Sequence, residues 1–297
     1  MCFAFTACGE GTWNNPNPEK DPDKQTYFSV ITRVPPKHLD PAQSYATDES
    51  LFIMQIYEPP LGYHFLKRPY ELEPLGLREM PAVEYLDRRG NQVEKGSSTI
   101  AYTRYVLKLR EDLRYQPHPA LAKDPQGKPR YLFETAKQSG RYQLLTDFPE
   151  TGSRPVMAKD YAYGIKRMAD PRNKSPMLGF MAQYIVGMSD FTKSVKKESR
   201  EEWLNLETLP MDGLEIIDET TLAITIHDQY PQFVYWLAMH FFAPIPVEAD
   251  RFYHNPGFKE KNLTLDWWPI GSGPFMMVKN DPNSEIVMER NPNYHPD

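Results

Sequence analysis

The stretch that decides the fold is Pro269–Tyr294, PIGSGPFMMVKNDPNSEIVMERNPNY. Its Gly271-Ser272-Gly273 tripeptide stands directly before a proline, a pattern that indicates a tight turn or a close approach of two backbones. The apolar run Phe275–Val278, a polar break and a second, alternating run then predict a β-hairpin. Asn291–Tyr294 closes the hairpin as a proline-set turn. The glycines are therefore interpreted as structural.

The composition of the 297 residues is that of a globular chain, with 40% hydrophobic and 13% aromatic residues. The 29 prolines are about double the ordinary share of roughly 5%, which favours short strands and turns over a helical bundle. The net charge of −6 argues against a nucleic-acid-binding protein, because such proteins concentrate basic residues on one face. No window reaches the roughly 18 apolar residues that a membrane span needs.

Both cysteines, Cys2 and Cys8, lie at the very start of the chain, so the rest can hold neither a disulfide nor a thiolate metal site. Small residues precede Cys8, as at the end of a bacterial lipoprotein signal, but the apolar stretch of a complete signal is missing. Two interpretations stay open: Cys8 is lipidated, or it is an incidental thiol. Residues 11–26 are polar and aperiodic and predict a linker.

The rest of the chain predicts a mixture of strands and helices. In 101–110 the odd-numbered residues from Thr103 to Leu109 form one face of a strand. Met157 stands where a helix cap is expected, and Asp160 is expected to compensate in part. The other predicted elements are a strand at 27–32, a turn at 39–45, a helix capped by Thr47, a helix ending at 169, a Met-rich helix from 176 packed in the core, a surface insertion such as a hairpin at 119–153, a hairpin at 213–226 and a helix from 231.

Five landmarks resemble, in order, segments of the family 5 bacterial extracellular solute-binding proteins, the peptide-binding-type receptors of ABC importers. They are LDP…IYEP at 39–59, YVLKLRE at 105–111, AKDYAYGIKRMADP at 158–171, the hairpin–helix–PIP run ending at 246, and GSGPF…RNPNY at 271–294. The resemblance implies an α/β fold of the periplasmic-binding-protein type II kind, in which two lobes close on a ligand.

The resemblance also implies how the chain is divided. Residues 1–26 would be a lipoprotein-like leader and linker, and 27–297 the first lobe, with a mixed β-sheet and flanking helices. Within that lobe, 27–45 and 210–297 would carry the main sheet and 46–209 an inserted subdomain. The second lobe is expected to be absent from this chain, which would make it an N-terminal fragment of a longer receptor.

By this resemblance the chain is the extracytoplasmic substrate-binding component of an ABC importer, located in the periplasm or cell envelope. Its expected partners are a peptide or other small solute, the permease subunits and, through a lipid on Cys8, the membrane; nucleic acid is not among them. Other family members take nickel, haem, opines or oligosaccharides. The residues predicted to face the ligand cleft are Ser44, Tyr45, Tyr57 and Trp236, each with core packing as the competing interpretation.

The sequence contains no recognisable catalytic motif, and its histidines lack metal-ligand spacing. No cofactor, metal or enzymatic activity is expected. His240, on an apolar face, is interpreted as a core histidine with a satisfied hydrogen bond. Two alternatives remain: a peptide hydrolase that uses Ser272 or a pair of carboxylates, and a surface interaction lipoprotein without a transport role.

Overall fold

The computed structural model describes residues 26–28, 35–198, 203–281 and 283–294. Its strands are β1 (Thr26–Phe28), β2 (Leu61–Tyr63), β3 (Leu72–Pro74), β4 (Ala82–Leu86), β5 (Gln92–Val93), β6 (Tyr102–Lys108), β7 (Leu214–Ile216), β8 (Thr221–His227), β9 (Phe275–Asn280) and β10 (Ile286–Arg290). Its α-helices are α1 (Thr47–Ile56), α2 (Ala136–Ser139), α3 (Ala158–Ala169), α4 (Leu178–Met181), α5 (Met188–Val195), α6 (Phe233–Trp236) and α7 (Val247–Tyr253).

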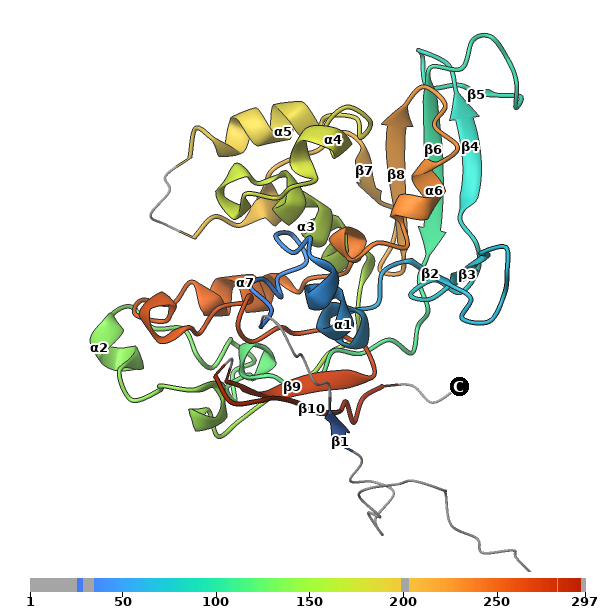
Figure 1. Ribbon diagram of the computed structural model, residues 1–297. Helices are drawn as coiled ribbons and strands as arrows, with labels where there is room; N and C mark the ends of the chain where they lie inside the picture. Colours follow the sequence, from blue (N-terminus) through green and yellow to red (C-terminus); the bar gives the residue numbers. More distant parts are fainter. Residues whose placement is uncertain (1–25, 29–34, 199–202, 282, 295–297) are drawn as a thin grey trace, which may run out of the picture.

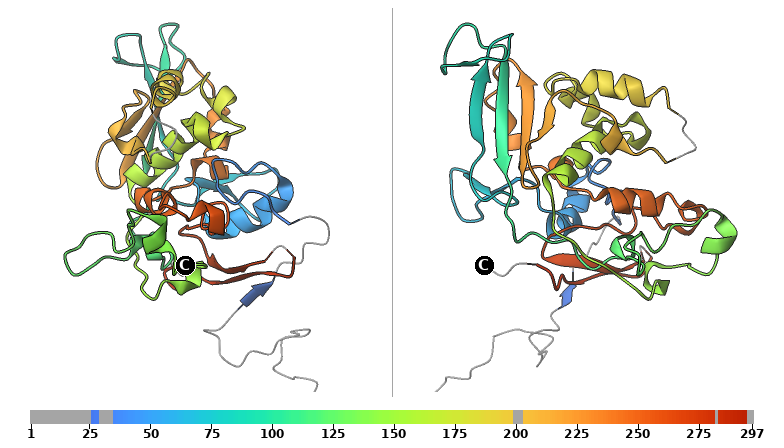
Figure 2. Two further views of the ribbon diagram at one scale, coloured as in Figure 1. Left: turned by 90° about the vertical axis from the view of Figure 1, so that its left-hand side faces the viewer. Right: turned by 180° about the vertical axis from the view of Figure 1, so that it is seen from behind.

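The strands form three sheets. The largest is antiparallel with the order β5-β4-β6-β8-β7 and stands upright at the right of Figure 1. A three-stranded sheet, β1-β10-β9, lies at the bottom, and a small β2-β3 hairpin lies between the two. Helices α1, α3 and α7 occupy the space between the two larger sheets, which makes the described part an α/β body (Figures 1 and 2).

The predicted strand around β6 and the two predicted hairpins are confirmed. Buried and half-buried residues alternate along β6, with Thr103, Tyr105 and Leu107 on the buried face. β7 pairs with β8, and β9 pairs with β10, both antiparallel. The strand predicted at 27–32 is described only over β1, which pairs with β10.

The division of the sheets differs from the expectation that 27–45 and 210–297 carry one main sheet. β7 and β8 pair with β6, a strand of the predicted inserted subdomain, and only β9 and β10 share a sheet with β1. The reason is that β8 alternates apolar and polar residues in register with β6, so that Ile224 and Ile226 lie on the face of Tyr105 and Thr103.

Two helices predicted from apolar spacing are shorter than expected. The stretch from 176 forms only α4, because Ile185 makes a β-bridge with Ile226 and Gly187 adopts a left-handed conformation with φ 75°. The stretch from 231 forms α6 and then a separate 3₁₀ turn, His240–Phe242, because Met239 is extended. The Met-rich stripe is nevertheless core, as predicted, since Met177, Met181 and Met188 are buried.

The insertion at 119–153 is not the surface hairpin that was predicted. It contains two 3₁₀ turns and α2, and three of its aromatic residues are buried: Tyr131, Tyr142 and Phe148. Tyr142 stacks on Phe148 at 4.1 Å, and Phe148 meets Phe252 of α7 edge-on at 5.2 Å. The segment stays ordered because these rings extend the hydrophobic core.

The glycines of the GSG tripeptide allow a close approach of two backbones, as predicted. Gly273 donates its amide to the carbonyl of Ile56, the last residue of α1, at 2.8 Å. A β-carbon on Gly271 would collide with the same carbonyl oxygen. The tripeptide therefore docks the three-stranded sheet against the end of α1.

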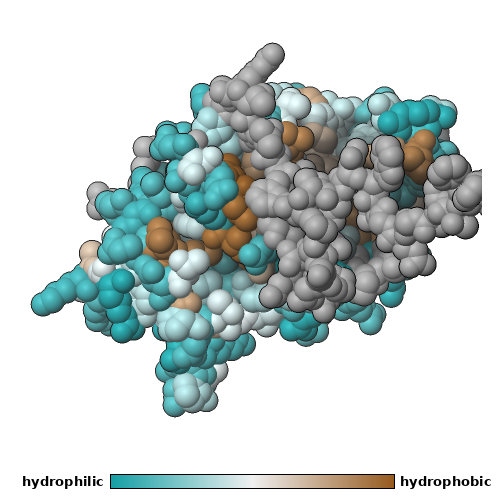
Figure 3. Space-filling view, turned by 60° about the horizontal axis from the view of Figure 1, so that its bottom comes forward, coloured by the Kyte–Doolittle hydropathy of each residue, from teal (hydrophilic) through white to brown (hydrophobic). Residues whose placement is uncertain are grey.

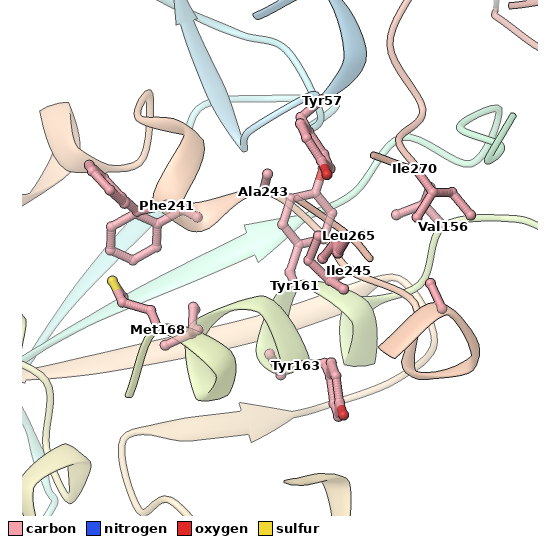
Figure 4. Packing of buried hydrophobic residues seen from close by; sticks show 14 of the residues in the cluster. Tyr57, Val156, Tyr161, Tyr163, Met168, Phe241, Ala243, Ile245, Leu265 and Ile270 are labelled. Atoms are coloured by element: carbon pink, nitrogen blue, oxygen red, sulfur yellow. The ribbon is translucent and has the colours of Figure 1, made fainter. Parts of the chain in front are cut away.

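The core between the two larger sheets is built largely around α3. Tyr57 and Tyr161 point into the same region, with Ile245 and Leu265 beside them (Figure 4). The start of α3 lacks a side-chain cap at Met157, and the carboxylate of Asp160 accepts the Met157 amide at 2.9 Å instead. The expected compensation is thus confirmed.

The underside of the molecule, drawn in Figure 3, includes hydrophobic surface. A band of hydrophobic surface borders hydrophilic residues on this face (Figure 3). The three-stranded sheet lies on this side, and several of its apolar side chains are only half-buried: Phe275, Met276, Val278, Ile286 and Val287.

Candidate ligand-binding surface

A single carboxylate holds the loop that leads into α1. Thr47, the predicted cap, is the first helical residue, and Ala46 at the cap position has no side-chain acceptor. Glu49 replaces it by accepting hydrogen bonds from the amides of Lys37, His38, Tyr45 and Ala46 and from the hydroxyl of Ser44. Burial raises the pKa of Glu49, but these donors outweigh burial and leave its pKa below the usual value.

A second carboxylate holds the same loop from the other side. Asp266 accepts the amides of Leu39 and Asp40 and lies 2.9 Å from Nδ1 of His38. Burial, followed by the nearby charge of Asp40, raises the pKa of Asp266. Because Glu49 and Asp266 together fix residues 37–46, the loop presents its exposed residues in one conformation.

The loop is also joined to the core by a buried ion-pair network. Arg167 of α3 donates from both terminal nitrogens to the carboxylate of Asp40, each at 2.8 Å, and from Nε to Asp250 at 2.9 Å. Tyr163 and Trp203 each donate to the second oxygen of Asp250 at 2.8 Å. Every oxygen of both carboxylates therefore has a donor.

Burial disfavours the charged forms of these carboxylates, and their hydrogen-bonding and ion-pair partners outweigh this effect. Burial alone would raise the pKa of Asp40 and of Asp250, but the Arg167 guanidinium holds the pKa of both below the usual value. The network joins the LDP landmark to the AKDYAYGIKRMADP landmark, which are far apart in the sequence. Both landmarks are thus parts of one scaffold for the loop.

Tyr45 is the predicted site residue that this scaffold exposes. Its side chain is 71% exposed, and its ring lies 6.4 Å from that of Phe241. Ser44, beside it, is fully buried, and its hydroxyl donates to Glu49 at 2.7 Å. The structure therefore brings Tyr45 to the surface and places Ser44 in the clamp beneath it.

His240 links the loop to the α6 segment. It is 5% exposed, and its Nε2 lies 3.1 Å from the carbonyl oxygen of Ser44. Burial lowers its pKa below the usual value. The interpretation of His240 as a satisfied core histidine is confirmed.

Trp236 is half-buried at the end of α6, within a group of aromatic rings. The ring of Phe180 lies 5.0 Å from that of Trp236, and Nε1 of Trp236 lies 3.4 Å from the hydroxyl of Tyr230. The ring of Tyr230 in turn stacks on that of Tyr184 at 4.3 Å. Tyr235, which directly precedes Trp236, is 49% exposed. We call Tyr45, Tyr235 and Trp236 the aromatic surface.

Tyr57 does not belong to this surface. It is 1% exposed, and its hydroxyl is buried without a hydrogen-bond partner in the described part of the chain. Burial, and then the charge of Asp40, raises its pKa well above the usual value. Of the four predicted site residues, Tyr45 is exposed and Trp236 is half-buried, whereas Ser44 and Tyr57 are buried.

The residues that organise this surface were not predicted. Glu49 could have been found, because a glutamate in the first turn of a helix often accepts the amides that precede it. Arg167 and Asp250 gave no such signal, since only the folded chain brings them to Asp40. Sequence reasoning therefore selected Ser44 and Tyr45 of the loop but not the buried charged residues that hold it.

Ser272, the candidate nucleophile, is 1% exposed, and its hydroxyl has no hydrogen-bond partner among the described residues. A serine nucleophile needs a base within hydrogen-bond reach. The described residues also contain no group of three His, Cys, Asp or Glu side chains placed to hold a metal ion. Within the same residues, every helix is too short or too polar to cross a membrane.

Solved structures of bacterial binding proteins share this fold. The Escherichia coli murein tripeptide binding protein MppA superposes with a TM-score of 0.53 at 19% identity, over 87% of this chain and 37% of that one. The chain therefore has the fold of a part of this binding protein.

The chain belongs to the bacterial extracellular solute-binding proteins, family 5, whose middle-region model matches residues 150–297. The periplasmic oligopeptide-binding protein OppA of Salmonella typhimurium is 24% identical over 140 residues, 47% of this chain and 23% of OppA. The probable deoxycholate-binding periplasmic protein YgiS of Escherichia coli is 23% identical over 161 residues, 52% of this chain and 26% of YgiS. The matches thus span about a quarter of the length of these relatives, and both relatives are binding proteins.

Proposed function

We propose that the chain is the extracytoplasmic substrate-binding component of an ABC importer and supplies one wall of its ligand cleft. The observation that carries this proposal is the family match together with the scaffold beneath Tyr45. Two carboxylates and a buried arginine network fix a loop whose exposed residue is an aromatic ring. Such preorganisation reduces the entropy lost on binding, which is what a receptor needs.

Peptides are the proposed ligands. An extended peptide is held through its backbone, and aromatic side chains such as those of the aromatic surface then bury its apolar side chains. The relatives include an oligopeptide-binding protein and a probable deoxycholate-binding protein, so the ligand class rests on the site and not on the family alone. Bulky apolar peptides are expected to bind better than acidic ones, because the aromatic surface itself carries no cation.

The opposite wall of the cleft is proposed to come from sequence beyond this chain. In support, the superposition on a peptide-bound Listeria monocytogenes OppA structure includes 88% of this chain but only 38% of the OppA chain, with a TM-score of 0.52. Residues 27–297 would then form the first lobe, and the closed pair of lobes would dock on permease subunits. The proposed lipid anchor at Cys8 and residues 11–25 of the proposed linker lie outside the described residues, and Thr26, the last residue of that linker, begins β1.

Uptake of labelled di- to pentapeptides by a strain lacking the gene tests the transport role. Uptake is expected to fall, and to recover when the intact gene is returned. Replacement of Tyr45 by alanine should reduce the recovery, whereas Tyr102→Ala in β6 should not, since Tyr102 lies on the opposite face of β6 from Tyr105, which contacts α6 through Phe233. Unchanged uptake in the deletion strain would favour a surface lipoprotein without a transport role.

The hydrolase alternative has less support. A nucleophile at Ser272 would require the buried hydroxyl to meet both a base and a substrate, and its position under the end of α1 offers neither. Purified chain is expected to leave a peptide library intact. Cleavage that Ser272→Ala abolished would establish the alternative.

A further inference from the structure

The loop between β2 and β3, residues 64–71, carries the most exposed large apolar side chains of the described residues. Phe65 is 87% exposed and Leu66, directly after it, is 77% exposed. We call this loop the hairpin tip. It projects from the edge of the body in the front view and again in the view from behind (Figures 1 and 2).

The backbone of the hairpin tip forms hydrogen bonds within the tip itself. The Leu66 amide donates to Nδ1 of His64 at 3.2 Å, and the His64 amide donates to the Glu71 carbonyl at 2.9 Å. Arg68 donates from Nη1 to the carbonyls of Phe65 and Lys67, at 3.4 and 2.7 Å. These backbone groups therefore do not depend on water, which lowers the cost of moving the tip into a medium of low polarity.

Two tyrosines stand behind the apolar pair. The rings of Tyr63 and Tyr70 meet edge-on at 6.1 Å, and the guanidinium of Arg68 lies 4.2 Å from the centre of the Tyr70 ring. Tyr70 is 66% exposed and Tyr63 is 44% exposed. Tyrosine is enriched where one end of a side chain meets hydrocarbon and the other meets water.

The charge of the hairpin tip is opposite in sign to that of the whole chain. Lys67 and Arg68 follow the apolar pair directly, although the chain carries a net charge of −6. Within residues 64–71, Lys67 pairs with Glu71 at 2.6 Å, which leaves the positive charge of Arg68 in excess; the next carboxylate, Glu73 of β3, lies outside the tip and acts on Lys67. The tip is thus a convex apolar point with cations beside it.

We propose that the hairpin tip inserts Phe65 and Leu66 into the interfacial layer of a bilayer that contains anionic lipids. Tyr63 and Tyr70 then lie among the headgroups, where Lys67 and Arg68 meet phosphates. A convex point with apolar residues at its apex enters a headgroup layer directly, whereas a protein partner would need a matching pocket. Charge complementarity selects anionic over zwitterionic lipid. The contact orients the chain on a membrane and requires no bound solute.

The test uses the purified 297-residue chain with Cys8→Ser, so that no acyl chain contributes. Binding is measured by co-sedimentation with vesicles of phosphatidylglycerol and phosphatidylethanolamine, and with vesicles of phosphatidylcholine alone. The anionic vesicles are expected to bind more chain, and added salt should weaken the binding. Phe65→Ser/Leu66→Ser should reduce binding at least about tenfold, since burial of two large apolar side chains is lost.

A matched control replaces another exposed apolar pair, Ile216→Ser/Ile217→Ser at the far edge of the five-stranded sheet, and should leave binding unchanged. A second measurement places a reporter in the tip: Phe65→Trp should be quenched by brominated lipid. Three results would overturn the proposal: no sedimentation with anionic vesicles, equal binding by the tip variant and the wild type, or a wild-type dimer that the tip variant abolishes, which would identify a second copy as the partner.

Discussion

Arg167 and Arg104 each bridge two carboxylates, in opposite surroundings. Arg167 binds Asp40 and Asp250 with only 5% of its side chain exposed. Arg104 binds two glutamates of the five-stranded sheet with 20% of its side chain exposed, and one of its partners is 62% exposed. The contacts of both are between 2.6 and 2.9 Å, so geometry does not distinguish them.

The difference lies in what would remain if either arginine were removed. Around Arg104, water would solvate the two glutamates. Around Arg167, two carboxylates would remain in the core without a cation. An exposed ion pair contributes little to stability, whereas breaking a buried one is costly because of the charge that it leaves. The network around Arg167 therefore fixes the loop beneath Tyr45, whereas the ion pairs of Arg104 add little to the stability of the five-stranded sheet.

The largest effect is expected from Arg167→Met. The variant should lose about 3–5 kcal/mol of unfolding free energy, because Asp40 and Asp250 would be left as uncompensated buried charges. Urea denaturation followed by circular dichroism measures this loss. A loss below about 1 kcal/mol would show that the network is as dispensable as a surface pair.

The cost of placing a charge in the core should also appear in the pH dependence of stability, through the buried neutral side chain of His118. His118 is fully buried, accepts the Ala120 amide through Nδ1 at 3.1 Å and lies 2.9 Å from the Tyr253 hydroxyl through Nε2. Burial lowers its pKa to about 3. Above pH ~6.5 the unfolded chain is also neutral at this residue, so the contribution of the neutral imidazole is complete.

As the pH falls from 6.5 toward 3, the unfolded state takes up a proton that the folded state refuses. Stability should therefore fall by about 1.4 kcal/mol per pH unit from this group. His118→Asn keeps an acceptor for the Ala120 amide but cannot titrate. Between pH 6 and 4.5 the unfolding free energy of this variant should therefore depend less steeply on pH than that of the wild type, because unfolding takes up about one proton fewer. Equal slopes for the two proteins would contradict this account.

Gly271→Ala tests the docking of the GSG tripeptide on α1. The added β-carbon would collide with the Ile56 carbonyl, so a loss of about 1–3 kcal/mol is expected. Gly179→Ala in α4 is the control, since a β-carbon there meets nothing within 4 Å. Thermal denaturation should show a lower midpoint for the first variant only.

The smallest effect is expected from Arg104→Met. Its loss should be at most about 1 kcal/mol, because its glutamate partners remain hydrated. Raising the salt concentration should narrow the difference from the wild type further. A loss as large as that of Arg167→Met would remove the distinction between the two networks.

Local patterns predicted much of the fold. The β6 alternation, the hairpins at 213–226 and 275–290 and the apolar face of α3 all follow from spacing along the chain. The helices expected from 176 and 231 ended early because long-range contacts prevailed over local periodicity: Ile185 pairs with Ile226, and Met239 is extended. The core role of 119–153 was missed because its aromatic residues have no helical or strand period.

The candidate site could be predicted only in part, for a physical reason. Tyr45 and Trp236 were selected because aromatic residues next to a helix start or at a helix end are visible in sequence, and their role in binding stays a prediction. Arg167 is 127 residues from Asp40 and 83 residues from Asp250 in the chain, and only folding brings the three side chains together. Ser44 was selected beside Tyr45, but its hydroxyl is held by Glu49.

The most direct test of the central claim is isothermal titration calorimetry of the 297-residue chain with di- to pentapeptides. If this chain supplies one wall of a cleft, peptides should show no saturable binding tighter than about 1 mM, because half of the contacts are missing. Saturable binding with a low-micromolar Kd would contradict the claim and show that this lobe forms a complete site by itself.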